Sequence, residues 1–238
     1  MPAEPSAIVH KARDFEHLKE EAENALTQLM AEFWHTENPD RRSAILEEIE
    51  ASHYGEELLA FVAKLLGLKD ESLRLRAVDL LAGNTAAAIL PILEGALADP
   101  SEAVRMNAVA AVAQVRDDAV VGYLGKVFED GSENVRLAGL DVLENQTQDR
   151  KLKVLGRALQ ATHSDVQTAA IGTLQLESTA QSVEVLFDAL DAADPEVRHE
   201  AQFSIDFLVD REFSSADEAR TWWIENKDKF DRDLVLKE

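Results

Sequence analysis

The amino-acid sequence predicts an all-α fold, a right-handed α-solenoid of stacked helical hairpins with a 31-residue period. Short patterns recur at this interval, and the apolar positions inside each repeat follow helical spacing. Glycine and proline are scarce, at 10 and 6 of 238 residues, which favours helices over turn-rich β structure. One such repeat has too little surface to form a core by itself, so neighbouring repeats must stack.

The register of the repeat is set by Val104 and Arg105, which follow Asp99 and Pro100. Steps of one period lead, without an insertion, to four equivalent pairs: Leu73-Arg74, Val135-Arg136, Val166-Gln167 and Val197-Arg198. Five units therefore share one register, and each begins with a helix that we call helix A.

Helix A carries one column of small residues and one of large apolar residues. The small column is Ala77, Ala108, Gly139, Ala170 and Ala201. The large column is Leu81, Val112, Leu143, Leu174 and Ile205. They lie four and eight residues after the first position of each pair, so both occupy the same side of a helix. A small residue lets the next helix approach closely, and the large residue fills the space beside it.

A second helix in each unit, helix B, carries three apolar columns spaced by three and then four residues. The columns are Leu59, Leu90, Val121, Leu152 and Val183; Val62, Leu93, Leu124, Leu155 and Leu186; and Leu66, Leu97, Phe128, Leu159 and Leu190. Short polar links join the two helices, as expected for helical hairpins.

The domain organisation follows from where this register holds. Residues 1–39 are expected to form a tail and a capping helix that starts near residue 12. Residues 40–226 are expected to form about six hairpins, with degenerate units at both ends, and residues 227–238 a charged tail. Helix starts are predicted where an N-cap residue precedes proline, at Asn38-Pro39, Asp99-Pro100 and Asp194-Pro195.

Composition restricts the classes of function. The formal net charge of −22 opposes binding to nucleic acid or to anionic membranes, and it is compatible with a basic protein or peptide partner. The chain has no cysteine, so thiolate catalysis and Cys-ligated zinc are excluded. No apolar run is long enough to span a membrane, and the first residues do not resemble a signal peptide, so we expect a cytoplasmic protein.

The repeat resembles the HEAT-like family, specifically the short class first associated with phycobilin lyase subunits. The resemblance lies in the pattern of a turn, Val-Arg, a small residue and an apolar residue, and it covers about residues 40–226. It implies a stack of helical hairpins that serves as a protein-protein interaction scaffold or adaptor. The alternative that it implies is an enzyme-assisting or lyase-type subunit. The oligomeric state stays open.

No catalytic, cofactor-binding or metal-binding residues are predicted. Val197 to Ala201, which includes His199 and Glu200, is similar to a His-Glu motif of deoxyhypusine hydroxylase, a HEAT-repeat di-iron enzyme. The equivalent positions of the other units lack both the imidazole and the carboxylate that two metal ions would require. The net charge of −22 opposes a function like that of the HEAT-like DNA glycosylases, because those enzymes need a basic face. We therefore expect a protein that is not an enzyme.

An arginine column recurs in four units, at Arg74, Arg105, Arg136 and Arg198. It could bind an anion, but the resemblance implies a structural role, in which each arginine bonds carbonyl groups and acids of the adjacent unit. Where the arginine is replaced by Gln167, the upstream aspartate of the pattern is also missing, being Ala161. This coincidence favours the structural interpretation.

The non-core positions of helix B are the predicted partner-binding surface, because helix B lines the concave side of HEAT solenoids. We call this surface the helix B face. Its candidate residues are Glu94, Lys126, Lys153, Arg157, Glu184, Phe187, Asp188 and Asp191. The sequence predicts a basic spot at Lys126, Lys153 and Arg157, followed by an exposed Phe187 among acids, over which an extended segment or helix of a partner could lie.

Overall fold

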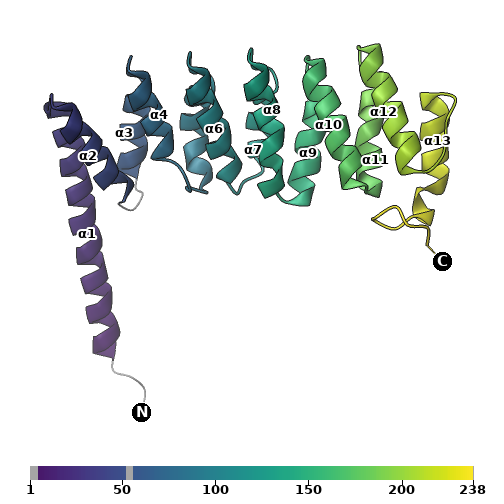
Figure 1. The fold of residues 1–238 in the computed structure, drawn as a ribbon. Coiled ribbons are helices and arrows are strands. Elements are labelled where there is room, and N and C mark those ends of the chain that lie inside the picture. Colours follow the sequence, from purple (N-terminus) through teal and green to yellow (C-terminus); the bar gives the residue numbers. More distant parts are fainter. Residues whose placement is uncertain (1–4, 52–55, 238) are drawn as a thin grey trace. The chain divides into compact units, whose positions relative to one another are not determined.

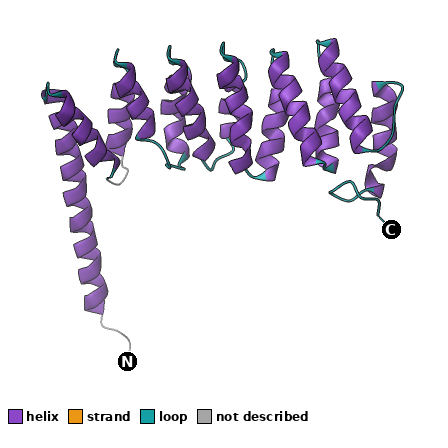
Figure 2. Ribbon diagram, in the orientation of Figure 1, coloured by secondary structure: helices purple, strands orange, loops and turns teal. Residues whose placement is uncertain are grey.

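The computed structural model describes residues 5–51 and 56–237, and within them every regular element is a helix (Figures 1 and 2). The predicted all-α fold of helical hairpins is confirmed. The one β interaction in this part of the chain is an isolated antiparallel bridge between Phe230 and Leu236. The chain divides into two compact units, residues 1–82 and residues 83–238.

The first unit consists, where described, of α1 (Pro5–His35), α2 (Pro39–Glu50), α3 (Glu56–Leu66) and α4 (Glu71–Asp79). Helix α1 starts earlier than the expected position near residue 12. Its C-terminal end is fixed by Phe33, which is 1% exposed and meets the rings of Trp34 and Phe61 edge-on, with centroids 5.1 and 5.4 Å away. Asn38 caps α2 as predicted, since its side chain accepts from the backbone nitrogen of Asp40 at 2.9 Å.

The second unit alternates B and A helices. Its helices are α5 (Leu90–Leu97), α6 (Glu102–Gln114), α7 (Val120–Val127), α8 (Glu133–Asp141), α9 (Gln148–Ala158), α10 (Ser164–Glu177), α11 (Ala180–Leu186), α12 (Pro195–Leu208) and α13 (Ala216–Asn226). Short 3-10 turns precede α5 (η1, Ala87–Ile89) and follow α8, α11 and α13 (η2, Val142–Asn145; η3, Phe187–Asp191; η4, Lys227–Lys229). Helices α6, α8, α10 and α12 pack side by side as one layer, and α5, α7, α9 and α11 as the other (Figure 1).

The columns found in the sequence form the core between these layers. Each alanine of the small column is fully buried, and the large column is at most 1% exposed. The middle column of helix B is likewise fully buried from Val62 to Leu186. The first column is less regular, because Leu59 and Val121 are half-buried while the preceding Leu58 and Val120 are at most 1% exposed. The B helices are therefore rotated slightly from the expected register at these two points.

Gly139 of the small column lies against the only aromatic residue of the helix B columns, Phe128. A Cβ atom at Gly139 would stand 2.9 Å from Cε1 of Phe128 and 3.0 Å from Cγ1 of Val127. Cβ atoms essentially never come closer than 3.0 Å to another heavy atom, so alanine cannot be accommodated here without movement. The absence of a side chain at Gly139 makes room for the larger ring at Phe128.

Two features differ from the sequence prediction: the start of α6 and the segment that follows α13. Asp99-Pro100 does not cap a helix, because the Asp99 carboxylate accepts from the backbone nitrogen of Ser101 at 2.8 Å and α6 begins only at Glu102. Residues 227–237, expected as a charged tail, form η4 and the β-bridge. The Phe230 ring in this segment stacks on Trp223 with centroids 5.9 Å apart.

Candidate interaction surface

The first half of the helix B face is a set of ion pairs between neighbouring helices. Lys126 of α7 donates to Glu94 of α5, and this hydrogen bond raises the pKa of Lys126. Lys153 of α9 reaches two carboxylates, Asp149 at 2.7 Å and Asp118 at 3.3 Å. These contacts raise the pKa of Lys153. Both lysines are therefore already neutralised by acids of the same chain.

The expected basic spot is thus reduced to one residue. Arg157 is exposed, and among the described residues it has no ion-pair partner. Its stem passes close to Gly125 of the preceding B helix, since a Cβ there would lie 3.8 Å from Cβ of Arg157. For Lys126 the sequence could not show the ion pair, because it depends on where Glu94 of the adjacent unit lies; for Lys153 the four-residue spacing from Asp149 was a signal.

The second half of the helix B face is acidic and partly paired. Glu184 accepts from Lys227 at 3.0 Å, and Asp191 accepts from Arg220 at 2.6 Å. Phe187 is half-buried, so the expectation of an exposed ring was wrong; the residue lies at the start of η3, and its carbonyl accepts from Arg220 at 3.0 Å. Asp188 is exposed and has no ion pair within the described part of the chain.

The arginine column makes two kinds of contact. Nη1 of Arg105 donates to the carbonyl of Asp99 at 2.8 Å in its own unit, while Nε and Nη2 grip the carboxylate of Asp130 in the next. Arg136 makes a similar pair of contacts: it donates to the carbonyl of Asp130 at 2.8 Å, and its Nε and Nη2 both donate to Oδ2 of Asp165, at 3.0 and 2.6 Å. Burial of Asp165 opposes ionisation, but its hydrogen bonds outweigh this, so the pKa of Asp165 is lowered.

The other two arginines also bind carbonyls of the turn before them. Arg74, which is 8% exposed, donates to the carbonyls of Leu68 at 3.1 Å and Lys69 at 2.9 Å. Arg198 is exposed; it donates to the carbonyls of Ala192 and Ala193, and it has no carboxylate partner among the residues that the structure describes.

The joint absence of the arginine at Gln167 and of the aspartate at Ala161 is not explained by a side-chain contact between these two positions. The Asp130 carboxylate, six residues before Arg136, pairs with Arg105 of the preceding unit, whereas Arg136 of its own unit binds the backbone oxygen of Asp130. The side chain at position 161 therefore does not determine what position 167 must be.

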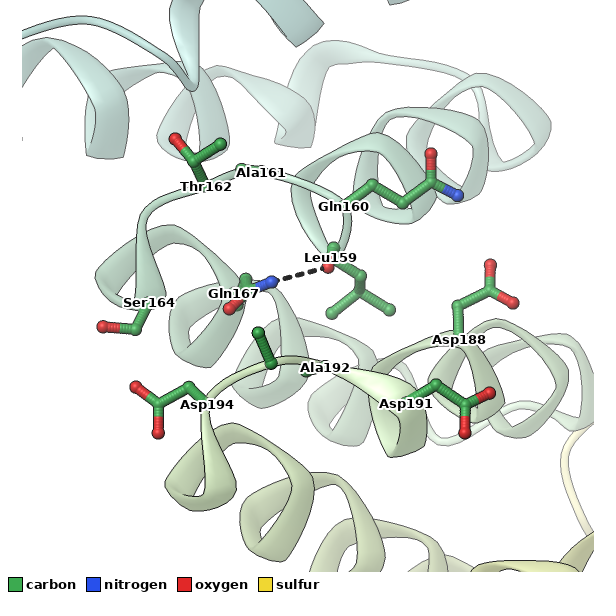
Figure 3. Close-up of a pocket in the computed structure, with 11 residues that line it drawn as sticks. Leu159, Gln160, Ala161, Thr162, Ser164, Gln167, Asp188, Asp191, Ala192 and Asp194 are labelled. Carbon is green, nitrogen blue, oxygen red and sulfur yellow. Dashed lines mark hydrogen bonds between the residues drawn. The ribbon is translucent and has the colours of Figure 1, made fainter.

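At Gln167 the arginine column is interrupted, and a hollow of about 510 Å³ lies beside this residue (Figure 3). The shorter side chain turns back, and its Nε2 donates to the carbonyl of Leu159 in its own unit at 2.9 Å. Figure 3 shows Asp188 and Asp191 on one side of the hollow and Asp194 on the other. Asp194 caps α12 through the backbone nitrogen of Glu196 at 2.8 Å. The lining offers mainly hydrogen-bond acceptors to whatever enters.

Residues outside the helix B face also stand out, and the sequence prediction missed them. Phe203 and Phe207 of α12 and Leu176 of α10 are 57%, 64% and 86% exposed. The register of the repeat contained the signal, because these positions fall outside the buried columns of helix A and yet are large and apolar. His199 and Glu200 lie on the same helix and are also exposed.

The described residues contain no group of three or more histidine, aspartate or glutamate side chains placed to hold a metal ion. None of the helices that the structure describes is long and apolar enough to cross a membrane.

Comparison with known protein families agrees with the hairpin geometry. Residues 123–206 match the family described as HEAT repeats, and residues 89–115 match the family described as HEAT repeat. This chain belongs to the HEAT-like repeat family. The matched HEAT repeats contain the paired arginines Arg105 and Arg136, the interruption at Gln167 and all eight candidate residues of the helix B face.

Solved repeat proteins are similar to this HEAT-repeat chain at low identity. A designed armadillo repeat protein in complex with the peptide (KR)4 is 20% identical, with a TM-score of 0.43, and the match covers 77% of this chain and 99% of that one. Cex1p is 13% identical, with a TM-score of 0.49, over 81% of this chain and 44% of that one. Human deoxyhypusine hydroxylase is 14% identical, with a TM-score of 0.38, over 87% and 92%. No curated protein matched the chain.

Proposed function

We propose that this HEAT-repeat protein is a non-enzymatic interaction scaffold or adaptor, and that its helix B face binds a segment of a partner protein. One observation carries the proposal. Within the described part of the chain, the charged side chains of this face are ion-paired except at Arg157 and Asp188, which are exposed. They lie one repeat period apart, at equivalent positions of adjacent units.

Asp188 lines the hollow beside Gln167, and Arg157 lies three residues before Gln160, which also lines it. An extended or helical segment crossing the units at this point could pair an acid with Arg157 and a lysine or arginine with Asp188. The net charge of −22 and the acceptor-rich hollow favour a partner that is basic overall. Glu94, Lys126, Lys153, Glu184 and Asp191 would then flank the contact through residues already held in place by ion pairs. A cytoplasmic location remains part of this proposal.

The test is quantitative affinity capture from native lysate with a charge-swapped protein. Arg157→Glu combined with Asp188→Lys reverses both unpaired charges and leaves the net charge unchanged. The matched control is Arg116→Glu combined with Glu144→Lys, because both residues are exposed, lie outside the helix B face and give the same balance.

Partners that the wild type and the control retain and that the swapped variant loses support the proposal. Equal recovery by all three proteins, or no stoichiometric partner with the wild type, would contradict it. Circular dichroism of both variants checks that the helices are intact.

A further inference from the structure

Two phenylalanines form an exposed apolar surface on the helix A layer. Phe203 and Phe207 lie four residues apart on α12 and therefore share one side of the helix, with 57% and 64% of their surface exposed. The opposite side of α12 carries Val197, Ala201 and Ile205, each at most 1% exposed. The two rings therefore lie outside the buried columns of the core, and we expect their removal to leave the packing between units intact.

The neighbouring helix extends this surface. Helix α10 packs beside α12, and Leu176 occupies in α10 the position that Phe207 occupies in α12, one repeat later. Leu176 is 86% exposed. Gly172 occupies the position of Phe203, and a Cβ added there would meet no atom within 4 Å. The space beside the Phe203 ring is therefore open, and an incoming side chain can reach it.

A rim of carboxylates borders the apolar surface. Phe203 and Phe207 line a hollow of about 350 Å³ together with Asp206, Asp210 and Glu212. Arg211, which also lines it, is already engaged: Nη2 lies 3.5 Å from Glu218, and its guanidinium lies over the rings of Phe213 and Trp222 at 5.2 and 5.5 Å. Among the described residues, Asp210 and Glu212 have no ion-pair partner, so the rim is negative.

The negative charge of the rim indicates which kind of partner fits the apolar surface. A second copy of the chain would bring the same aspartates and glutamate against themselves in a symmetric contact, which like charges disfavour. An amphipathic helix with apolar residues at positions i and i+4 and with lysine or arginine beside them would bury the rings and pair with the rim. We propose that Phe203, Phe207 and Leu176, with Asp206, Asp210 and Glu212, form a second docking surface for a basic amphipathic helix of a partner protein.

The surface lies on α10, α12 and the residues that follow α12, outside the helix B face, so it does not depend on the function proposed above. The probe is a fluorescein-labelled helical peptide of about five turns with leucines at i and i+4 bordered by lysines, titrated in fluorescence anisotropy against the full chain. Phe203→Ala combined with Phe207→Ala is expected to weaken binding about tenfold or more, because aromatic anchors dominate such contacts. The matched control is Ile224→Ala, which shortens an apolar side chain that is 72% exposed on α13.

The contribution of the rim is measured separately with Asp206→Asn, Asp210→Asn and Glu212→Gln together. The control for net charge is Glu133→Gln, Asp141→Asn and Glu144→Gln, three exposed acids of α8 and η2. The rim variant is expected to weaken binding about fivefold, with less than a twofold effect in the control. Equal losses in both would reduce the binding to net charge and overturn the proposal. A dimer in light scattering that the Phe203→Ala, Phe207→Ala protein no longer forms would identify a second copy as the occupant and overturn it too.

Discussion

Arg105 and Asp130, which are 25 residues apart, form a two-pronged ion pair between consecutive units, with Nε to Oδ2 at 2.7 Å and Nη2 to Oδ1 at 3.0 Å. Both side chains are largely buried, at 16% and 10% exposure. The same guanidinium holds the carbonyl of Asp99. One side chain therefore closes the turn of its own unit and attaches the next unit to it.

A double-mutant cycle on Arg105→Ala and Asp130→Ala should give a coupling energy of about 1–2 kcal/mol, since the pair is bidentate and shielded from water. The comparison is the exposed pair of Lys126 and Glu94, for which a clearly smaller coupling energy is expected because water screens both charges. Both energies come from urea denaturation followed by circular dichroism. Equal coupling in the two cycles would contradict the structural role of the arginine column.

Gln167→Arg should complete the arginine column and stabilise the protein. Asp165, the acceptor for Arg136, has its equivalent one repeat later in Glu196, so an arginine at position 167 would have a carboxylate in the corresponding place. We expect a gain of about 0.5–1 kcal/mol in the free energy of unfolding, measured with urea. The gain should disappear when Glu196→Gln is added, and a gain that survives this change would show that the new arginine binds elsewhere.

Gly139→Ala should destabilise the protein by about 1–3 kcal/mol, because the new methyl group would overlap the ring of Phe128. Phe128→Leu in the same protein should recover part of this loss. The matched control is Gly122→Ala on the exposed side of α7, where a Cβ meets nothing within 4 Å, and a gain of about 0.5–1 kcal/mol is expected from the better helix former. Thermal denaturation distinguishes the three variants, and a neutral Gly139→Ala would refute the close packing.

The pH dependence of stability should depend on Glu177. A hydrogen bond from Lys151 outweighs burial and lowers the pKa of Glu177 below its ordinary value of 4.5. Because the unfolded chain then binds the proton more readily, the pair contributes stability above pH 4.5 and loses it as the pH falls through the lower pKa of the folded state. The melting temperature of wild type minus that of Lys151→Met should shrink progressively as the pH is lowered below 4.5. A constant difference over this range would exclude the pair as its origin.

Repetition made the fold predictable, whereas the surface depends on contacts that repetition does not encode. Ala108 and Val112 could be placed in the core because their columns recur in each unit, and each is fully buried. Lys126 looked like a free cation because its acid, Glu94, comes from another position of the adjacent unit, whereas Lys153 also pairs with Asp149 on its own helix, a partner that the four-residue spacing could have indicated. The predicted exposure of Phe187 failed for a related reason, since the chain leaves α-helical geometry there and enters η3.

The contact between Gly139 and Phe128 has a consequence for how this chain could be rearranged. In a repeat protein, whole units can be removed, duplicated or exchanged when the side chains at every junction between units pack in the same way. A junction that joined the helix B ending in Phe128 to a helix A with alanine in the small column would combine a large ring with a methyl group. The units are therefore not interchangeable modules, and any shortened or extended version of this protein must carry Gly139 together with Phe128.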